Sequence, residues 1–179
     1  DEREYISVAF TWDLPAVRQD ILGGNLYHGR PLVGGPAVRL MPEYLADIAE
    51  IGGDCAGVLQ RVNPLATRTT VGCPNRCSFC AVPITEGAFR EMDDWPNLPI
   101  ICDNNLLASS QRHFNRVIDR LKGQNDVDFN QGLDARLLTK HHADRLAELD
   151  CMVRLAWDAT PSERHLLTAV ARLRRAGIP

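Results

Sequence analysis

The chain has 179 residues, of which 45% are hydrophobic and 24% are charged, a composition that fits one globular domain with a small appendage. No apolar run approaches the roughly 20 residues that a membrane-spanning helix needs. The formal net charge of −3 gives no overall basic field, so neither a membrane nor a nucleic-acid partner is indicated.

Residues 1–65 are predicted to form a small α/β segment. The apolar runs at 5–12 and 31–38 are typical of strands. A helix is predicted between Pro42, a favoured first helical residue, and Gly52, a favoured residue just past a helix end.

From residue 66 to residue 179, strand patterns alternate with helix patterns. Strands are predicted at 67–71, 98–102, 127–131 and 152–157. Helices are predicted after caps at Ser109 or Ser110, at Thr139 and at Thr160. This alternation predicts four βα units in a parallel sheet with right-handed crossovers. The chain stops where a fifth strand would begin, and we expect it to be a fragment of a longer protein rather than a degenerate one.

The most informative feature is a run of three cysteines, Cys73, Cys77 and Cys80, in the segment Thr-Val-Gly-Cys-Pro-Asn-Arg-Cys-Ser-Phe-Cys. A loop with this spacing can wrap three thiolates around one iron–sulfur cluster. Such clusters usually take four cysteine ligands, so three leave one iron open. An open coordination position is where chemistry takes place, as it is in catalytic zinc sites.

Two other interpretations of the cysteines are weaker. Six cysteines and no secretory leader indicate a reducing compartment, so we expect a cytoplasmic location and no disulfide framework. A structural zinc site needs four ligands, and Cys55, Cys102 and Cys151 form no second pair. Zinc or a plain electron-transfer cluster remains an alternative.

The cysteine run, with the aromatic Phe79 just before the last thiol, resembles the signature of the radical S-adenosylmethionine (SAM) enzymes. The resemblance implies that Cys73, Cys77 and Cys80 hold a [4Fe-4S] cluster whose open iron binds the amino and carboxylate groups of SAM. An electron from the cluster would then cleave SAM to methionine and a 5′-deoxyadenosyl radical. It also implies a partial, TIM-barrel-like (βα) barrel of the radical SAM type, of which residues 66–179 would be the first four units.

Residues in the cysteine loop and around the carboxyl ends of the predicted strands are the candidate ligands of SAM, because barrels of this type place their sites there. They are Phe79, Asp103, Asn104, Asn105, Gln131, Arg154 and Asp158. Asp103–Asn105 stands where the family places a motif, often Gly-Gly-Glu, that binds the SAM ammonium. The acceptor would be the Asp103 carboxylate, an asparagine amide oxygen or a backbone carbonyl; an Asx-rich turn is the alternative.

The other candidates have less specific roles. Arg154 would bind the SAM carboxylate, Gln131 or Asp158 would meet the ribose hydroxyls or the substrate, and Phe79 would flank the adenine. Asn75 and Arg76 are expected to shape the cysteine loop. A salt-bridge network is the alternative to these roles, and its members would be Asp134, Arg136, Arg154 and Asp158.

Many radical SAM enzymes carry a cobalamin-binding domain before the barrel, and Val33–Pro36 is similar to one of its strands. Residues 1–65 are therefore interpreted as a degenerate remnant of such a domain. The Asp-x-His-x-x-Gly motif that supplies the cobalt ligand is absent, because Gly29 follows His28 directly and no aspartate stands two residues before it. Cobalamin binding is not expected.

The leading hypothesis is a radical SAM enzyme that acts on an unidentified small-molecule or macromolecular substrate. It would take electrons from a donor such as a flavodoxin or ferredoxin, and no catalytic residue beyond the cluster ligands is predicted. One alternative is a cluster-binding or electron-transfer module without SAM cleavage. Another is a tRNA-modifying methylthiotransferase-like enzyme, but that group has further cysteines upstream, which Cys55 alone does not supply.

Overall fold

The structure is a computed structural model that describes residues 4–24, 30–53, 57–157 and 163–179. The chain forms two compact units. The first comprises Asp1–Arg61 with Cys77–Gly87, and the second comprises Val62–Arg76 with Ala88–Pro179. No helix in the four described ranges is long and apolar enough to cross a membrane.

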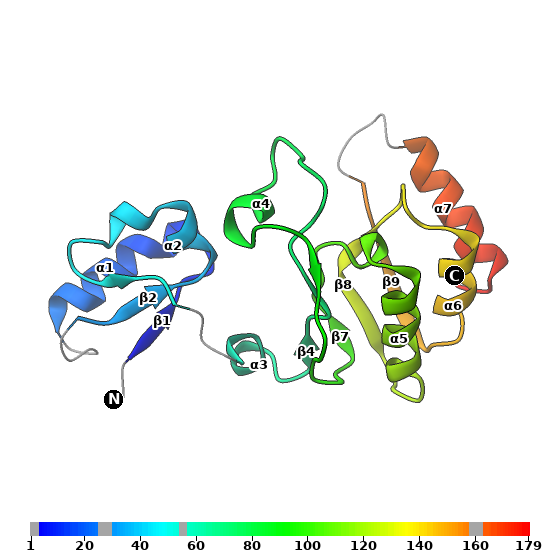
Figure 1. The fold of residues 1–179 in the computed structure, drawn as a ribbon, viewed down its shortest axis with the longest axis horizontal. Coiled ribbons are helices and arrows are strands. Elements are labelled where there is room, and N and C mark those ends of the chain that lie inside the picture. The colour runs from blue at the N-terminus through cyan, green and yellow to red at the C-terminus, as the bar shows by residue number, and fades with distance from the viewer. Residues whose placement is uncertain (1–3, 25–29, 54–56, 158–162) are drawn as a thin grey trace. The chain divides into compact units, whose positions relative to one another are not determined.

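The first unit contains a three-stranded parallel sheet in the order β1-β2-β3 (Figure 1). Its strands are β1 (Tyr5–Ser7), β2 (Leu32–Gly34) and β3 (Glu50–Ile51). Its helices include α1 (Leu14–Gly23), α2 (Pro36–Leu40) and α4 (Val82–Thr85), with 3-10 turns at Thr11–Asp13 and Pro42–Tyr44; α3 (Val58–Val62) follows at the division between the units. Arg39 of α2 donates to the carbonyl of Thr85, which ties the later segment to this unit.

Two predictions for this part of the chain are wrong, and one helix was not predicted. The helix predicted from Pro42 to Gly52 is a single 3-10 turn, and Glu50–Ile51 is extended because it pairs with β2. The runs at 5–12 and 31–38 are strands only in their first parts. Helix α1 was not predicted at all, although the left-handed Gly24 (φ 64°) ends it as a glycine C-cap does.

The second unit contains a four-stranded sheet in the order β4-β7-β8-β9, and every neighbouring pair is parallel. Its strands are β4 (Ala66–Thr67), β7 (Ile100–Ile101), β8 (Val127–Asp134) and β9 (Cys151–Ala156). The predicted parallel strands, neighbouring in sequence order, are confirmed. A short antiparallel hairpin joins β5 (Thr70–Val71) to β6 (Arg90–Glu91).

The helices of this unit begin where the sequence provides caps. In α5 (Gln111–Leu121) the Ser110 hydroxyl accepts from the His113 amide at 3.1 Å. In α6 (Lys140–Leu146) Thr139 and His142 form a reciprocal capping box. A 3-10 turn, Leu106–Ala108, precedes α5, and α7 (Glu163–Arg175) is the last helix; the predicted Thr160 cap lies outside the described residues.

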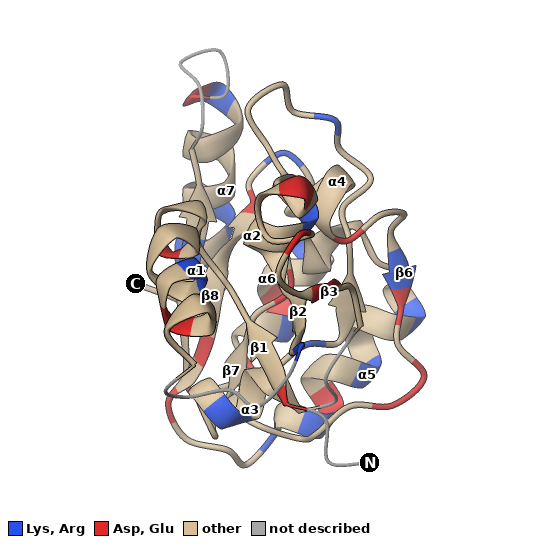
Figure 2. Cartoon of the chain, turned by 90° about the vertical axis from the view of Figure 1, so that its left-hand side faces the viewer, with Lys and Arg blue, Asp and Glu red and all other residues tan. Residues whose placement is uncertain are grey.

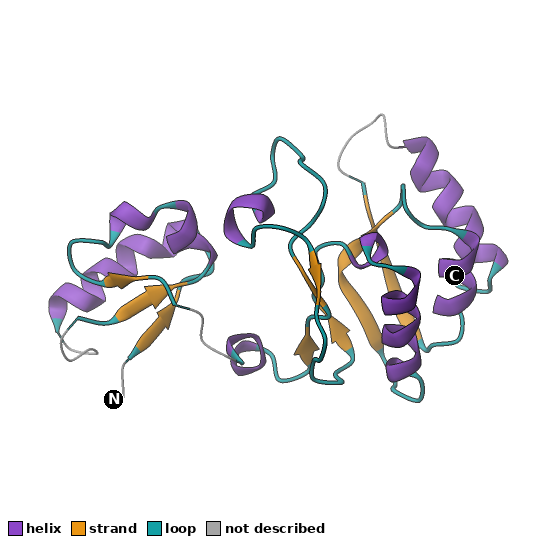
Figure 3. Ribbon diagram, viewed as in Figure 1, coloured by secondary structure: helices purple, strands orange, loops and turns teal. Residues whose placement is uncertain are grey.

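One face of this sheet carries all three long helices, α5, α6 and α7 (Figure 1). Strand β9 shows the resulting alternation, because Val153 and Leu155 pack into the helix-side core whereas Met152 is 57% exposed. The second unit is therefore an α/β structure in which the parallel strands follow one another in chain order. Its described strands form no closed barrel. Figure 3 shows that most of the chain between β5 and β7 is loop.

Candidate functional site

The cysteine run begins directly after β5. Cys73 belongs to the second unit, whereas Cys77 and Cys80 begin the segment that belongs to the first unit. The Cys80 amide donates to the Cys77 carbonyl at 3.0 Å, which closes a turn around Ser78 and Phe79. All three thiols are partly buried and free of disulfide bonds, and the Phe79 ring is 69% exposed.

Asn105, which follows β7, lies against the first cysteine. Its Nδ2 lies 3.6 Å from Cys73 Sγ and 3.3 Å from Asp134 Oδ2. The side chain is 3% exposed, and its Oδ1 is buried without a hydrogen-bond partner among the described residues. A buried acceptor of this kind costs free energy unless something bonds to it, so this oxygen marks a place for a donor that the chain does not itself provide.

Asp134, at the end of β8, binds the groups around Asn105. Its Oδ1 accepts from the Arg136 backbone amide at 3.1 Å and from Arg136 Nε at 2.8 Å. Its Oδ2 accepts from Arg136 Nη2 at 2.6 Å and from Asn75 Nδ2 at 3.0 Å, in addition to Asn105. Burial alone would raise the pKa of Asp134, but the hydrogen bonds from Arg136 and Asn75 lower it.

Asp103 is one of the predicted acceptors for the SAM ammonium, but its carboxylate already accepts three hydrogen bonds from the chain. Oδ1 accepts from the amides of Thr69 (2.6 Å) and Thr70 (3.0 Å), and Oδ2 accepts from the Thr69 hydroxyl at 2.5 Å. The side chain is 4% exposed, and burial raises its pKa despite these bonds. In this geometry Asp103 joins the residues after β7 to Thr69 and to Thr70 of β5, and the chain fills three of the roughly four acceptor sites of its carboxylate.

The hydrogen bonds around Asp103 continue from Thr69 to His113 and Glu91, two residues that the sequence analysis did not single out. His113 Nε2 lies 3.2 Å from the Thr69 hydroxyl, and its Nδ1 lies 3.8 Å from Glu91 Oε2. Burial lowers the pKa of His113, although the nearby carboxylates act in the opposite direction. The available signal was the place of His113 beside Phe114 on the apolar face of α5, because a buried polar side chain needs a partner.

The remaining candidates do not gather at this site. Arg154 pairs with Asp128, which lies opposite Met152, so its guanidinium is held toward the amino end of the sheet. Gln131 is exposed within the register shift of β8, and Asn104 is partly buried. Asp158 lies outside the described residues. Of the predicted salt-bridge network, the pair Asp134–Arg136 is present, whereas Arg154 pairs with Asp128, which is not a member of that network.

Two of the described cysteines, Cys102 and Cys151, lie outside the motif. Burial raises the pKa of the Cys102 thiol, and it raises the pKa of Cys151 to about 11. Such thiols stay protonated near neutral pH and are poor metal ligands. Across the described part of the chain, no three His, Cys, Asp or Glu side chains are grouped as a complete metal site.

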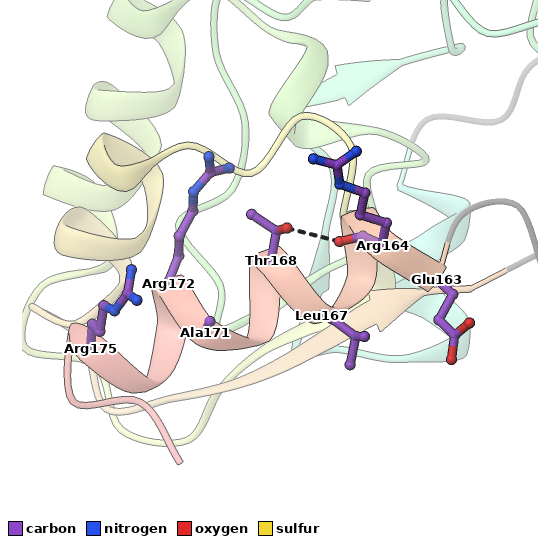
Figure 4. A pocket seen from close by; sticks show the side chains of 7 residues that line it. All are labelled: Glu163, Arg164, Leu167, Thr168, Ala171, Arg172 and Arg175. Carbon is purple, nitrogen blue, oxygen red and sulfur yellow. Dashed lines mark hydrogen bonds between the residues drawn. The ribbon is translucent and has the colours of Figure 1, made fainter.

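Two hollows lie apart from Asn105. One, of about 540 Å³, runs along α7, where Arg164, Arg172 and Arg175 project to one side (Figure 4). The other, of about 420 Å³, lies in the first unit near Gly34 and Gly52. Basic and acidic residues are interspersed over the ribbon, in keeping with the small net charge (Figure 2). Neither hollow contains a residue of the cysteine motif.

Comparison of the chain with protein-family models, with curated proteins and with solved structures finds no match in any of the three.

Proposed function

We propose that this chain belongs to a radical SAM enzyme, in which Cys73, Cys77 and Cys80 bind a [4Fe-4S] cluster. The spacing of the thiols and Phe79 is the sequence basis of the proposal. A parallel sheet wound in one direction with helices on one face supports it, because that arrangement is the wall of a (βα) barrel. The cysteine run also starts just after β5, and its first cysteine contacts Asn105, which stands four residues after the end of β7.

The observation that carries the proposal is the unpartnered Asn105 Oδ1. It is a buried acceptor next to a motif cysteine, at the carboxyl end of β7, where the resemblance implies the acceptor for the SAM ammonium. An ammonium bound there would satisfy this oxygen with a charge-assisted hydrogen bond. Among the three acceptors considered for Asp103–Asn105, the Asn105 amide therefore fits better than the occupied Asp103 carboxylate.

The residues of the site have separate tasks in this proposal. The three thiolates hold the cluster, which when bound supplies the electron that cleaves SAM. Asn105 Oδ1 orients the ammonium, and the exposed Phe79 would flank the adenine, as the resemblance implies. Arg154 is not assigned to the SAM carboxylate, because Asp128 already binds it. None of the described residues is assigned to binding the substrate or the electron donor.

Anaerobic reconstitution of the chain with iron and sulfide tests the proposal. We expect about four irons per chain, with the broad visible absorbance of a cubane cluster, and slow formation of 5′-deoxyadenosine from SAM under a strong one-electron reductant. Cys77→Ala should abolish both, because two thiolates do not retain the cluster. The matched control Cys151→Ala removes a buried thiol outside the motif and should leave both unchanged.

Two results would contradict the proposal. Binding of stoichiometric zinc with no uptake of iron would show that the three cysteines form a zinc site and not a cluster site. A stable cluster that never cleaves SAM would instead favour an electron-transfer module.

A further inference from the structure

We propose that Asp134 is a positioning residue that fixes the Asn105 amide against Cys73 and ties the cysteine loop to the sheet. The inference rests on the proposed function, since it concerns the same cluster. It assigns to Asp134 a control over the reduction potential of the cluster that the cysteine motif alone does not provide.

The first step of the argument is the orientation of the Asn105 amide. A carboxylate only accepts hydrogen bonds, so Asp134 Oδ2 at 3.3 Å requires the amide nitrogen, and not the amide oxygen, on its side. The same nitrogen has a second proton, which is directed at Cys73 Sγ at 3.6 Å. The reversed amide would place two acceptors together and would lose the contact with sulfur. Asp134 therefore determines both the N–H···S contact and the free Oδ1.

The second step concerns the loop. Asn75 stands two residues after Cys73 and donates to the same Oδ2 of Asp134 at 3.0 Å. Arg136 holds this carboxylate from the other side through Nε and Nη2, so Asp134 itself is fixed. One side chain at the end of β8 thus connects the residue after β7, the cysteine loop and Arg136. Such a network is rigid because each of its hydrogen bonds restrains the others.

The third step is the consequence for a bound cluster. Reduction adds negative charge to the cluster and its thiolate ligands, and an N–H donor near a ligand sulfur stabilises that charge. The Asn105 donor should therefore raise the reduction potential and ease acceptance of the electron. Removing Asp134 frees the amide to turn, and the potential should fall even though Asp134 does not touch the sulfur.

The test compares two aspartates of the same strand in the reconstituted chain. Asp134→Asn replaces an acceptor of three side chains with an amide. Asp128→Asn is the matched control, because Asp128 lies at the other end of β8 and also pairs with an arginine, Arg154 of β9. Redox titration followed by electron paramagnetic resonance should give a lower midpoint potential for Asp134→Asn and the parent value for Asp128→Asn. Asp134→Glu, which keeps the acceptor, should recover part of the shift.

A second variant separates the two roles of Asp134. Asn75→Ala removes the tie to the loop but leaves Asn105 in place, so it should speed loss of iron to a chelator without changing the midpoint potential. An unchanged potential in Asp134→Asn, or an equal shift in Asp128→Asn, would overturn the inference.

A measurement on iron-free protein separates failure of this inference from failure of the proposed function. In nuclear magnetic resonance spectra, the side-chain amide protons of Asn105 should exchange with water more slowly than those of the exposed Asn97. Asp134→Asn should remove that protection. Exchange of Asn105 as fast as Asn97 in the parent would overturn the positioning role whether or not a cluster binds. Protected amides in a chain that never takes up iron would contradict only the proposed function and the effect on potential that rests on it.

Discussion

Asp103 and Asp134 stand near the carboxyl ends of neighbouring strands in one sheet, yet their surroundings differ in kind. Asp103 accepts only from neutral groups of Thr69 and Thr70, and burial raises its pKa. Asp134 is held by the guanidinium of Arg136 as well as by amides, and its pKa is lowered. Asp103 therefore stabilises the sheet, whereas Asp134 positions the cysteine loop.

The comparison teaches that a carboxylate at a strand end is not by itself a ligand site. Both oxygens of Asp103 already accept hydrogen bonds from the chain, whereas the buried oxygen without a partner belongs to Asn105, two residues later. What distinguishes the two positions is which polar atoms the fold has already satisfied.

The largest effect is expected for Asp103→Ala, which should lower the free energy of unfolding by about 3 kcal/mol. The reason is that three buried donors of Thr69 and Thr70 lose their acceptor, and an unsatisfied buried donor costs about 1–3 kcal/mol. Urea unfolding followed by circular dichroism measures this change. A loss below about 0.5 kcal/mol would show that Asp103 does not stabilise the sheet, and the proposed difference between Asp103 and Asp134 would then not hold.

A smaller effect should appear in the pH dependence of stability. The folded pKa of Asp134 lies below the unfolded value of about 3.9, so its contribution is complete above that pH and is lost as the pH falls through the folded pKa. The folded pKa of Asp103 lies above the unfolded value, so its contribution is complete below about pH 3.9 and declines as the pH rises through the folded pKa.

The unfolding free energies of Asp134→Asn and Asp103→Asn, measured against the parent from about pH 3 to about pH 7, show how the contribution of each carboxylate changes with pH. The destabilisation caused by Asp134→Asn should shrink as the pH falls, whereas that caused by Asp103→Asn should grow. Slopes of the same sign would mean that the two carboxylates do not differ as described.

The smallest effect is expected at Arg154, whose guanidinium pairs with Asp128 on a partly exposed face of the sheet. Arg154→Ala should cost about 0.5 kcal/mol of stability, as exposed pairs do, and should leave SAM binding unchanged. Calorimetry of SAM binding to the reconstituted variant checks the second point. A large loss of SAM affinity would return Arg154 to the site and would show that its pair with Asp128 breaks when SAM binds.

The second unit was largely predictable because its signals are local and agree with one another. Ser110 and Thr139 are caps, and Phe114, Val117 and Leu121 mark one buried face of α5. The first unit was less predictable. Pro42 resembles a helix start, but pairing of the following residues with β2 outweighs that local preference.

The site was predictable in composition but not in detail. The sequence identified the cysteine run and Asp103–Asn105, yet it favoured no single acceptor within that tripeptide. The choice depends on contacts across more than thirty residues of chain, such as Thr69 with Asp103 and Cys73 with Asn105. Such long-range contacts cannot be inferred from the local sequence. For the same reason the contacts of His113 with Thr69 and Glu91 were not predicted.

Titration of the reduced, reconstituted chain with SAM, followed by electron paramagnetic resonance, tests the central claim most directly. SAM should change the spectrum of the parent cluster and of Asp103→Asn at similar concentrations. Asn105→Leu should need about tenfold more SAM, because it loses one hydrogen bond to a charged group, worth about 1.4 kcal/mol. A parent spectrum that no concentration of SAM changes would contradict the account, and so would loss of SAM binding in Asp103→Asn but not in Asn105→Leu.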